Sequence, residues 1–331
     1  MARITRQNDD TSFECAEDDT ILRAALRAGI GMPYSCNTGS CGNCRFELKD
    51  GAVEHLRADP PAWSERDLKR NRYLGCQAAP KGDCVVKFRT MDAFVPPHRP
   101  AIRTATLRAV TTVTRDISDF AFAIDGDPAF EPGQYALLHI PGVDGGRAYS
   151  MSNLGEDGTW RFMIKDVPGG AATTWLFDAE PGAEITIDGP YGTGYLRRDV
   201  PRDIVCLAGG SGLSPMVSIA RAALADGMLE SRKLHLFYGC RDEPDLFDAA
   251  ILGSDLLDRI TCTPALSEPA SGSSWTGATG YLHDVVRDRM GEALAECEIY
   301  FAGPAVMSAA VQKMAHEAGV PMDRLHFDEF Y

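Results

Sequence analysis

The sequence predicts three consecutive domains of different fold class: a small α+β domain, an antiparallel β-barrel and a doubly wound α/β domain. Three observations support this division. A loop rich in Cys and Gly lies in the first hundred residues, short alternating strands separated by Gly and Pro follow it, and apolar strands then alternate with helices. The expected domain ranges are 1–95, 101–198 and 199–331.

Four cysteines of the first domain have an informative spacing. Three lie in one loop in a C-x4-C-x2-C pattern and the fourth is distant in sequence: Cys36, Cys41, Cys44 and Cys76. This pattern is typical of [2Fe–2S] ligation, whereas zinc knuckles supply ligands as two tight pairs. Gly and Ser between the ligands would let backbone amides approach the sulfurs. A structural zinc site and unrelated buried thiols remain the alternatives.

Local signals mark the flanks of this domain. A short helix is expected at about 19–29, with Asp18 or Asp19 as N-cap and Gly29 at its end. Three prolines within residues 95–100 indicate a stiff connector to the second domain.

The second domain is predicted to be an antiparallel barrel, since alternating runs such as 105–110 and 135–140 are separated by Gly/Pro turns. Two of its segments suit a flavin nucleotide. The first, residues 147–150, offers a guanidinium for phosphate, a flat ring and a hydroxyl. The second, residues 167–173, places glycines and a Thr at the start of a helix, where N–H groups bind anions. Either segment alone is also common in ordinary half-buried structure. The expected contacts are Arg147, Ala148, Tyr149, Ser150, Ile164, Val167, Gly169, Gly170, Ala171 and Thr173.

The third domain contains three strand ends followed by glycine. In a doubly wound sheet, ligands bind at the carboxyl ends of the strands, so these ends predict one nucleotide crevice. The first turn lacks a G-x-G-x-x-G fingerprint, and ordinary sharp turns are the alternative reading. The expected nucleotide contacts are Gly209, Gly210, Ser211, Gly212, Leu213, Ser214, Pro215, Gly239, Arg241, Ala302, Gly303 and Pro304.

The charged residues that follow Gly239, at the end of the second of these strands, bear on which nucleotide binds. Arg241 stands where a residue that reads a 2′-phosphate would lie, but Asp242, Glu243 and Asp245 surround it. We therefore expect NADH rather than NADPH.

Composition excludes several classes of function. The 331-residue chain has a net charge of −14, with 15 Lys and Arg against 14 Asp and Glu in residues 1–99, and 18 against 33 in residues 100–331. An acidic body disfavours nucleic acid and anionic membranes as partners. No signal peptide or membrane-spanning run is evident, so a cytoplasmic location is expected, and the six other cysteines are interpreted as core residues.

With these motifs in this order, the whole chain resembles the reductase components of bacterial multicomponent oxygenases. These combine a plant-type ferredoxin domain of β-grasp fold, an FAD-binding barrel of the ferredoxin–NADP reductase superfamily and an NAD-binding domain. The cluster loop and Arg147-x-Tyr149-Ser150 carry the resemblance most specifically. Stretches 33–37, 65–76 and 325–331 look most similar to reductases of toluene 4-monooxygenase-type and alkene monooxygenases. Reductases of Rieske aromatic-ring dioxygenases share the architecture and remain competitors.

The resemblance implies an NADH-dependent iron–sulfur flavoprotein oxidoreductase, of the EC 1.18.1 type. Electrons would pass from NADH to FAD, to the [2Fe–2S] cluster and to an oxygenase, expected to be a di-iron monooxygenase reached directly or through a Rieske-type ferredoxin, in catabolism of aromatic hydrocarbons. FAD is needed because NADH gives up an electron pair as hydride, whereas the cluster accepts single electrons. Service to a Rieske dioxygenase or to a sugar-deoxygenation system is the alternative, and a cluster-based redox sensor is a reading from another class. We expect a monomer.

The resemblance also implies residue roles. Arg147 would bind the FAD pyrophosphate, Tyr149 would pack on the isoalloxazine, and Ser150 would lie near the flavin N5, so Tyr149 and Ser150 are the expected catalytic residues. Phe330 or Tyr331 would cover the flavin. Ala302 stands where many relatives have Cys before Gly-Pro, and we expect that thiol to be dispensable for hydride transfer.

Overall fold

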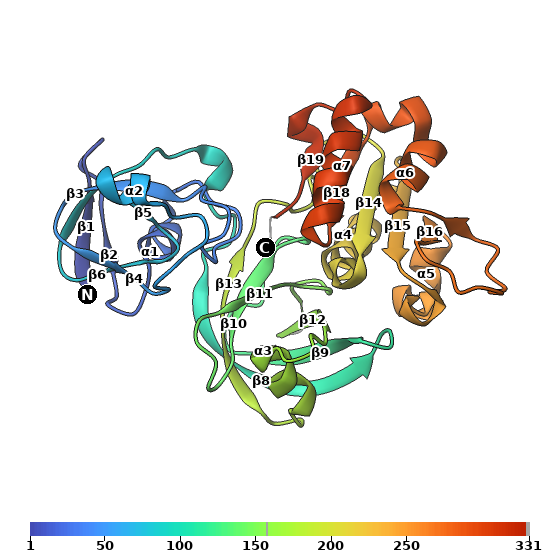
Figure 1. Cartoon of the computed structure of the whole chain (residues 1–331), viewed down its shortest axis with the longest axis horizontal. Helices are drawn as coiled ribbons and strands as arrows, with labels where there is room; N and C mark the ends of the chain where they lie inside the picture. The colour runs from blue at the N-terminus through green and yellow to red at the C-terminus, as the bar shows by residue number, and fades with distance from the viewer. Residues whose placement is uncertain (157, 329–331) are drawn as a thin grey trace.

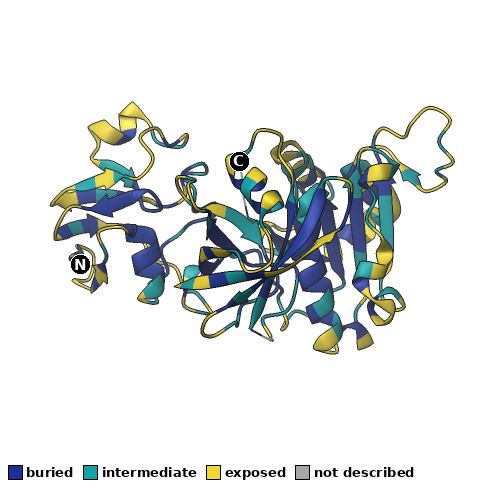
Figure 2. Cartoon of the chain, turned by 90° about the horizontal axis from the view of Figure 1, so that it is seen from below, coloured by how far each residue is buried: buried dark blue, intermediate teal, exposed yellow. Residues whose placement is uncertain are grey.

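The computed structural model describes residues 1–156 and 158–328 and arranges them as three domains, each built on its own main sheet (Figure 1). The N-terminal domain lies at one end of the long axis and the C-terminal domain near the other, with the middle domain contacting both. Strands of all three domains are largely buried, and exposed residues concentrate in loops and helix surfaces (Figure 2). No helix of the described residues is both long and apolar enough to cross a membrane.

The N-terminal domain is a mixed sheet of order β2-β1-β7-β3-β5, in which β1 and β7 run parallel, with a two-stranded sheet of β4 and β6 beside it. Helix α1 buries Ile21, Leu22 and Leu26 in the core. Its N-cap is Thr20, whose Oγ1 accepts from the Arg23 N–H at 3.4 Å, and not Asp18 or Asp19 as predicted. The elements are β1 (Ala2–Arg6), β2 (Ser12–Cys15), α1 (Ile21–Arg27), β3 (Arg45–Asp50), β4 (Val53–His55), α2 (Glu65–Lys69), β5 (Arg72–Leu74), β6 (Ala78–Pro80), β7 (Cys84–Lys87) and the 3-10 turn η1 (Asp92–Phe94).

The middle domain is a six-stranded antiparallel sheet of order β11-β10-β13-β8-β9-β12. A bridge between Met151 and Phe162 brings its two edges together, so the sheet nearly closes into a barrel around an apolar core. The elements are β8 (Ala101–Thr112), β9 (Ile117–Ile124), β10 (Tyr135–His139), β11 (Arg147–Ser150), β12 (Thr159–Lys165), α3 (Ala171–Asp178) and β13 (Glu184–Tyr191).

The C-terminal domain is a parallel sheet of order β17-β16-β15-β14-β18-β19 with helices on both faces. Alternate residues of β14 feed two separate cores: Cys206 and Ala208 pack on one face, Val205 and Leu207 on the other. The elements are β14 (Ile204–Gly209), η2 (Gly210–Gly212), α4 (Leu213–Ala225), η3 (Met228–Glu230), β15 (Leu234–Cys240), η4 (Glu243–Asp245), η5 (Ala249–Leu252), α5 (Ser254–Leu257), β16 (Thr261–Leu266), β17 (Ala278–Thr279), α6 (Leu282–Met290), η6 (Gly291–Glu296), β18 (Glu298–Ala302), α7 (Ala305–Glu317), η7 (Met322–Arg324) and β19 (Leu325–His326). The predicted combination of fold classes is confirmed.

A buried polar junction joins the N-terminal and middle domains. The Arg27 guanidinium lies 2.8 Å from Asp188 Oδ1 and 3.1 Å from Asp19 Oδ2, and the Tyr191 hydroxyl donates to Asp188 at 2.9 Å. Desolvation at this junction raises the pKa of Asp19. The apolar core of the N-terminal domain continues across the junction, because Tyr135 and Tyr191 of the middle domain pack into it.

Replacing Arg27 with Ala should destabilise this junction strongly. The Asp188 side chain is only 3% exposed, so losing its cation leaves a buried carboxylate unpaired. We expect a loss of about 3 kcal/mol and a thermal midpoint lower by several degrees. Arg287→Ala is the control, since Arg287 is 53% exposed and its pairing should contribute less than about 1 kcal/mol. Equal shifts in calorimetry for the two variants would contradict this account.

Candidate functional site

The four predicted ligand cysteines come together at one end of the N-terminal domain. The loop between α1 and β3 supplies Cys36, Cys41 and Cys44, and Cys76 follows β5. All are buried except Cys41, which is partly exposed. The thiols form two pairs, Cys36 with Cys41 and Cys44 with Cys76, whose side chains are close enough to hydrogen bond. In each pair this contact lowers the pKa of one thiol, that of Cys36 and that of Cys44.

This pairing fits two metal ions better than one. A tetrahedral zinc site would need all four sulfurs around one point, whereas a [2Fe–2S] cluster takes two thiolates at each iron. The donor arrangement therefore favours the cluster and disfavours the zinc alternative.

Polar groups of the loop are oriented toward the sulfurs. The N–H groups of Thr38, Ser40 and Cys41 donate to Cys36 Sγ at 3.4, 3.3 and 3.3 Å. Asn37 Nδ2 is buried and has no hydrogen-bond partner among the described residues, so it is available to a cluster sulfur. Buried Arg23 holds this segment through Asn37 Oδ1 at 3.3 Å and adds a positive charge beside an anionic cluster. Donors of this kind stabilise cluster sulfurs and tune their potential.

One glycine of the loop is required by its surroundings. Gly39 has φ +89°, and a Cβ there would lie 3.0 Å from Gln77 Cγ and 3.1 Å from Pro60 Cβ. Both the backbone conformation and the space exclude a side chain. The residue beside the fourth ligand thus packs against the loop that holds the other three.

The first flavin segment forms strand β11. The Arg147 guanidinium is exposed and donates to the carbonyls of Asp144 and Gly145, both at 3.0 Å, which orients it toward solvent where a phosphate could bind. Tyr149 packs against the barrel core, and burial raises the pKa of its hydroxyl. Ser150 is half-buried, and its carbonyl accepts from Ser214 Oγ at 2.7 Å.

The second flavin segment is the turn before α3. Thr173 is 5% exposed, and its hydroxyl bonds within the turn, to the Val167 carbonyl at 3.2 Å and the Gly170 carbonyl at 3.1 Å. Gly170 is the N-cap and makes no side-chain cap, so the first N–H groups of α3 stay available for an anion. Thr173 thus shapes the turn, and Val167, Gly169 and Ala171 are exposed in it, as is Pro168. Ile164 lies buried in β12.

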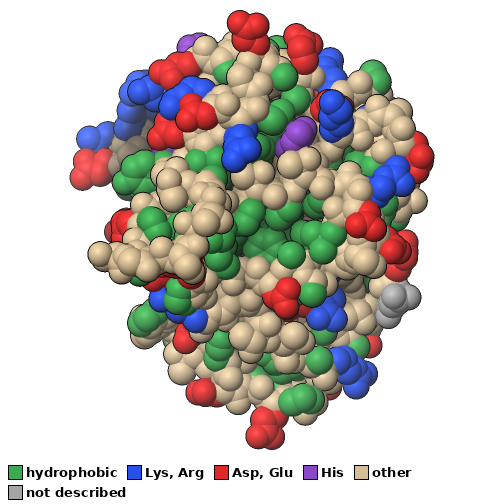
Figure 3. Space-filling view, turned by 90° about the vertical axis from the view of Figure 1, so that its right-hand side faces the viewer, with side chains coloured by type: hydrophobic (Ala, Val, Ile, Leu, Met, Phe, Trp, Pro, Cys, Tyr) green, Lys and Arg blue, Asp and Glu red, His purple; other side chains and the backbone are tan. Residues whose placement is uncertain are grey.

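A cavity of about 250 Å³ lies at the carboxyl edge of the parallel sheet. Strand order β15-β14-β18 makes the three predicted strand ends neighbours. Of the predicted residues, Gly209, Gly210, Gly239, Arg241 and Pro304 line the cavity. Figure 3 shows this side of the molecule, where apolar side chains gather around a central hollow.

Other predicted nucleotide residues lie behind the cavity. Leu213, Ser214 and Pro215 are buried in the first turn of α4, where Ser214 Oγ also accepts from the Met163 N–H at 3.2 Å. Ser211, Ala302 and Gly303 are half-buried, and a Cβ on Gly212 would overlap the Ala302 carbonyl. Gly212 therefore permits the close approach of the first and third strand ends. Phe330 and Tyr331 lie outside the described residues.

Several cavity residues were missed in the sequence. The middle domain contributes Asp116, Ile117 and Lys165, which no pattern within the third domain could indicate. Ser267 follows β16, a fourth strand end at the same edge, so the strand-end rule applied to residues 261–266 would have found it. The remaining missed residues are Tyr238, Cys240, Asp245, Gly280, Tyr281, Leu282 and Met307.

Two hydrogen bonds join the cluster loop to the middle domain. The Tyr135 hydroxyl donates to the Ser35 carbonyl at 2.7 Å, one residue before Cys36. Tyr135 pairs with Ser150 across β10 and β11, so it connects the two predicted sites directly. Tyr34 adds a second bond, since its hydroxyl accepts from the Gly192 N–H at 2.8 Å.

Three family models match successive parts of the chain. Residues 4–81 match a 2Fe–2S iron–sulfur cluster binding domain, residues 104–195 an oxidoreductase FAD-binding domain, and residues 206–313 an oxidoreductase NAD-binding domain. The predicted cofactor classes are thereby confirmed.

Full-length relatives are also found. The chain is 38% identical over 323 residues to ferredoxin–NAD(P)+ reductase CarAd of Metapseudomonas resinovorans, covering 96% of each chain. It is 37% identical over 351 residues to the ferredoxin–NAD+ reductase component of the alkene monooxygenase system of Xanthobacter autotrophicus, covering 98% of this chain and 99% of that one. A solved ferredoxin reductase in carbazole 1,9a-dioxygenase has a TM-score of 0.93 and 35% identity, with coverage of 100% and 98%.

Gly39→Ala should reduce cluster content. The added methyl group meets Gln77 and Pro60 and forces a positive φ on alanine, which displaces the loop that carries three ligands. Iron per chain and the visible absorbance of the cluster should fall to less than about half, while bound flavin is retained. Gly82→Ala is the control, since Gly82 also has a positive φ but meets nothing within 4 Å. Full cluster content in Gly39→Ala would show that the loop is not constrained as described.

Gly212→Ala should impair the nucleotide site and leave the cluster intact. Its Cβ would overlap the Ala302 carbonyl, so the strand ends β14 and β18 must separate. We expect the Kd for NADH to rise by at least about tenfold in fluorescence titrations. Gly227→Ala, at an open position after α4, should bind NADH as the unaltered protein does. Unchanged affinity in Gly212→Ala would exclude this edge as the nucleotide site.

Proposed function

Because this chain belongs to the oxidoreductases that serve as reductase components of multicomponent oxygenases, we propose that it moves electrons from NADH through bound FAD to a [2Fe–2S] cluster and on to an oxygenase. The observation that supports this route most directly is the hydrogen bond from Tyr135 to the Ser35 carbonyl. It joins the strand that pairs with Ser150 to the loop that holds Cys36.

Each part of the route has proposed residues. Arg147 and the N-terminal turn of α3 bind the FAD pyrophosphate, Tyr149 packs on the ring system, and Ser150 lies beside the atom that receives hydride. The carboxyl edge of the C-terminal sheet holds the nicotinamide nucleotide, with Gly209 and Gly239 allowing its backbone to approach closely. Bound FAD supplies the conversion of a hydride into single electrons. Cys36, Cys41, Cys44 and Cys76 hold the cluster.

The proposal specifies NADH rather than NADPH. Arg241 lines the cavity, but Asp245 lines it too, and Asp242 and Glu243 flank the same turn. Arg115 of the middle domain offsets part of this charge, at 3.4 Å from Asp242 and 2.8 Å from Asp245. Three carboxylates against two guanidinium groups still disfavour an extra phosphate.

The class of oxygenase is proposed on narrower grounds. Identities of 38% to CarAd and 37% to the alkene monooxygenase reductase do not separate the two classes of system. The stretches 33–37 and 65–76 favour a di-iron monooxygenase as the final acceptor. A Rieske dioxygenase is the second candidate, supported by the similarity to the reductase in carbazole 1,9a-dioxygenase.

An anaerobic titration with NADH and, separately, NADPH tests the proposal. Bleaching of the flavin bands by NADH, followed by a rhombic reduced-cluster signal in low-temperature EPR, is the expected result. Flavin that stays oxidised with both nucleotides would overturn the proposal and favour a redox sensor. Faster bleaching by NADPH would refute only the choice of nucleotide.

Tyr135→Phe should slow electron transfer from flavin to cluster and leave hydride transfer unchanged. It removes the hydroxyl that bonds the Ser35 carbonyl but keeps the ring in the core. In anaerobic stopped-flow experiments we expect the cluster to be reduced about tenfold more slowly after the flavin. Tyr300→Phe is the matched control, because its buried hydroxyl accepts from the Arg197 N–H and lies away from the cluster loop and the domain junction. Equal rates in both variants would exclude this bond from the route.

A further inference from the structure

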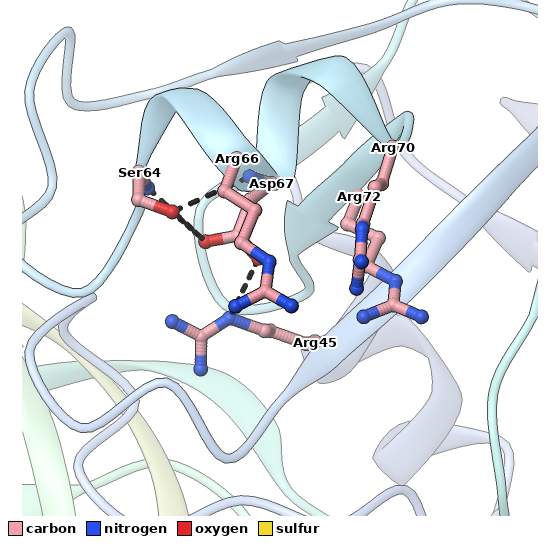
Figure 4. A pocket seen from close by; sticks show the side chains of 6 residues that line it. All are labelled: Arg45, Ser64, Arg66, Asp67, Arg70 and Arg72. Carbon is pink, nitrogen blue, oxygen red and sulfur yellow. Dashed lines mark hydrogen bonds and ion pairs between the residues drawn. The ribbon is translucent and has the colours of Figure 1, made fainter.

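The N-terminal domain carries a concentrated basic surface beside the cluster loop. Two adjoining hollows, the first of about 400 Å³, share Arg45 and Arg72 in their linings. Figure 4 shows the side chains of Arg66, Arg70 and Arg72 pointing to the same side of α2 as that of Arg45. We call the basic residues that line the two hollows the arginine face: Arg45, Arg66, Arg70, Arg72, Lys87 and Arg89.

Little of this charge is neutralised within the chain. The hollows contain two acidic residues, Asp67 and Glu47. Asp67 pairs with Arg45 at 3.2 Å and completes the capping box of α2. Glu47 pairs with Lys49 and lies opposite Arg72 and Lys87 on the neighbouring strands, so it offsets part of their charge. Across residues 1–156 and 158–328, no carboxylate lies within ion-pair distance of the other five members. Within the described part of the chain, Arg66, Arg70 and Arg89 have no such carboxylate beside them, and like charges held close together repel one another, so internal stability does not explain these three residues.

The arginine face adjoins the part of the loop where the cluster is least covered. Arg45 follows Cys44 directly, and its Nη1 donates to the Gly42 carbonyl at 2.9 Å. Gly42 is next to Cys41, the one partly exposed ligand. The Ser35 side of the loop is instead occupied by Tyr135 of the middle domain. Electrons therefore arrive at one part of the loop, and a partner can approach another.

Arginine is the chemistry that favours a protein as the occupant of this face. Arginines are enriched in protein-docking surfaces, where they contribute much of the affinity. Exposed Leu68 of α2 lines neither hollow, and a residue two positions from Arg66 does not share its helix face. The net charge of −14 of the chain disfavours a nucleic acid.

We propose that the arginine face docks the protein that accepts electrons from the cluster, and that this acceptor presents an acidic surface around its own redox centre. The proposal rests on the proposed function and adds the chemistry of the partner. Attraction between opposite charges would orient the acceptor before contact and speed association at low salt. Acidic residues elsewhere on this chain would repel the acceptor from unproductive positions.

Native cytochrome c, which is basic, and succinylated cytochrome c, which is acidic, test the proposal as acceptors with the same fold and haem. The full-length holoprotein should reduce the succinylated form faster at 10 mM salt, and that rate should fall at least tenfold at 300 mM. Arg66→Glu with Arg70→Glu should reverse the preference. Arg108→Glu with Arg289→Glu, which makes the same change in charge on the other two domains, should leave the preference unaltered.

Several outcomes would overturn the proposal. These are equal salt dependence for both cytochromes, an unchanged preference in the Arg66/Arg70 variant, or an equal change in the control variant. Retention of the protein by a double-stranded DNA fragment at 150 mM salt, lost in the Arg66/Arg70 variant, would identify a nucleic acid as the occupant instead. Flavin bleaching and the cluster EPR signal with NADH are recorded on the same samples. If neither flavin bleaching nor the cluster EPR signal is seen, the proposed function is wrong. If both are seen together with one of the outcomes above, only the docking proposal is refuted.

Discussion

The position of the cluster loop against the middle domain is the constraint on which the rest of the structure depends. Electronic coupling weakens steeply with distance, so the N-terminal domain must be held at one place on the barrel. One tyrosine hydroxyl from each domain holds it there. Tyr135 of the middle domain donates to the Ser35 carbonyl, and Tyr34 of the N-terminal domain accepts from the Gly192 N–H. The buried pairing of Arg27 with Asp188 adds orientation, because a buried ion pair tolerates little displacement of either partner. The apolar core extends through the same contact, which excludes water from it.

A second interface fixes the nucleotide cavity over the barrel. Side chains of α4 reach carbonyls of the segment after β11: Ser214 to Ser150 at 2.7 Å, Ser218 to Asn153 at 2.7 Å, and Arg221 to Ser152 at 3.0 Å. These bonds use backbone acceptors, so they hold the segment through its main chain, while the side chains of Ser152 and Asn153 bond within the barrel. Strand β11, which carries Tyr149 and Ser150, thus contacts the C-terminal domain through Ser214, and its neighbour β10 contacts the N-terminal domain through Tyr135.

Local patterns in the sequence predicted the chemistry well, and contacts between domains poorly. Cysteine spacing predicted that four thiols come together, because this information lies within nine residues and one later cysteine. Strand ends located the cavity edge because parallel strands place their carboxyl ends together. Lys165 and Asp116 were missed because another domain contributes them to the cavity. The bond from Tyr135 to Ser35 spans 100 positions, and neither residue type signals it. Thr20 replaced Asp19 as N-cap because Asp19 faces Arg27.

The junction between the first two domains also sets an order of events during synthesis. The middle domain contributes Asp188, Tyr191 and Gly192 to this junction, and these residues follow Cys76 by more than a hundred positions. Domains fold largely as units while the chain emerges from the ribosome. The nascent cysteine loop is therefore complete, and open on its Ser35 side, before the barrel can cover it. The Ser35 side therefore remains accessible only during that interval, and closure of the barrel then covers it.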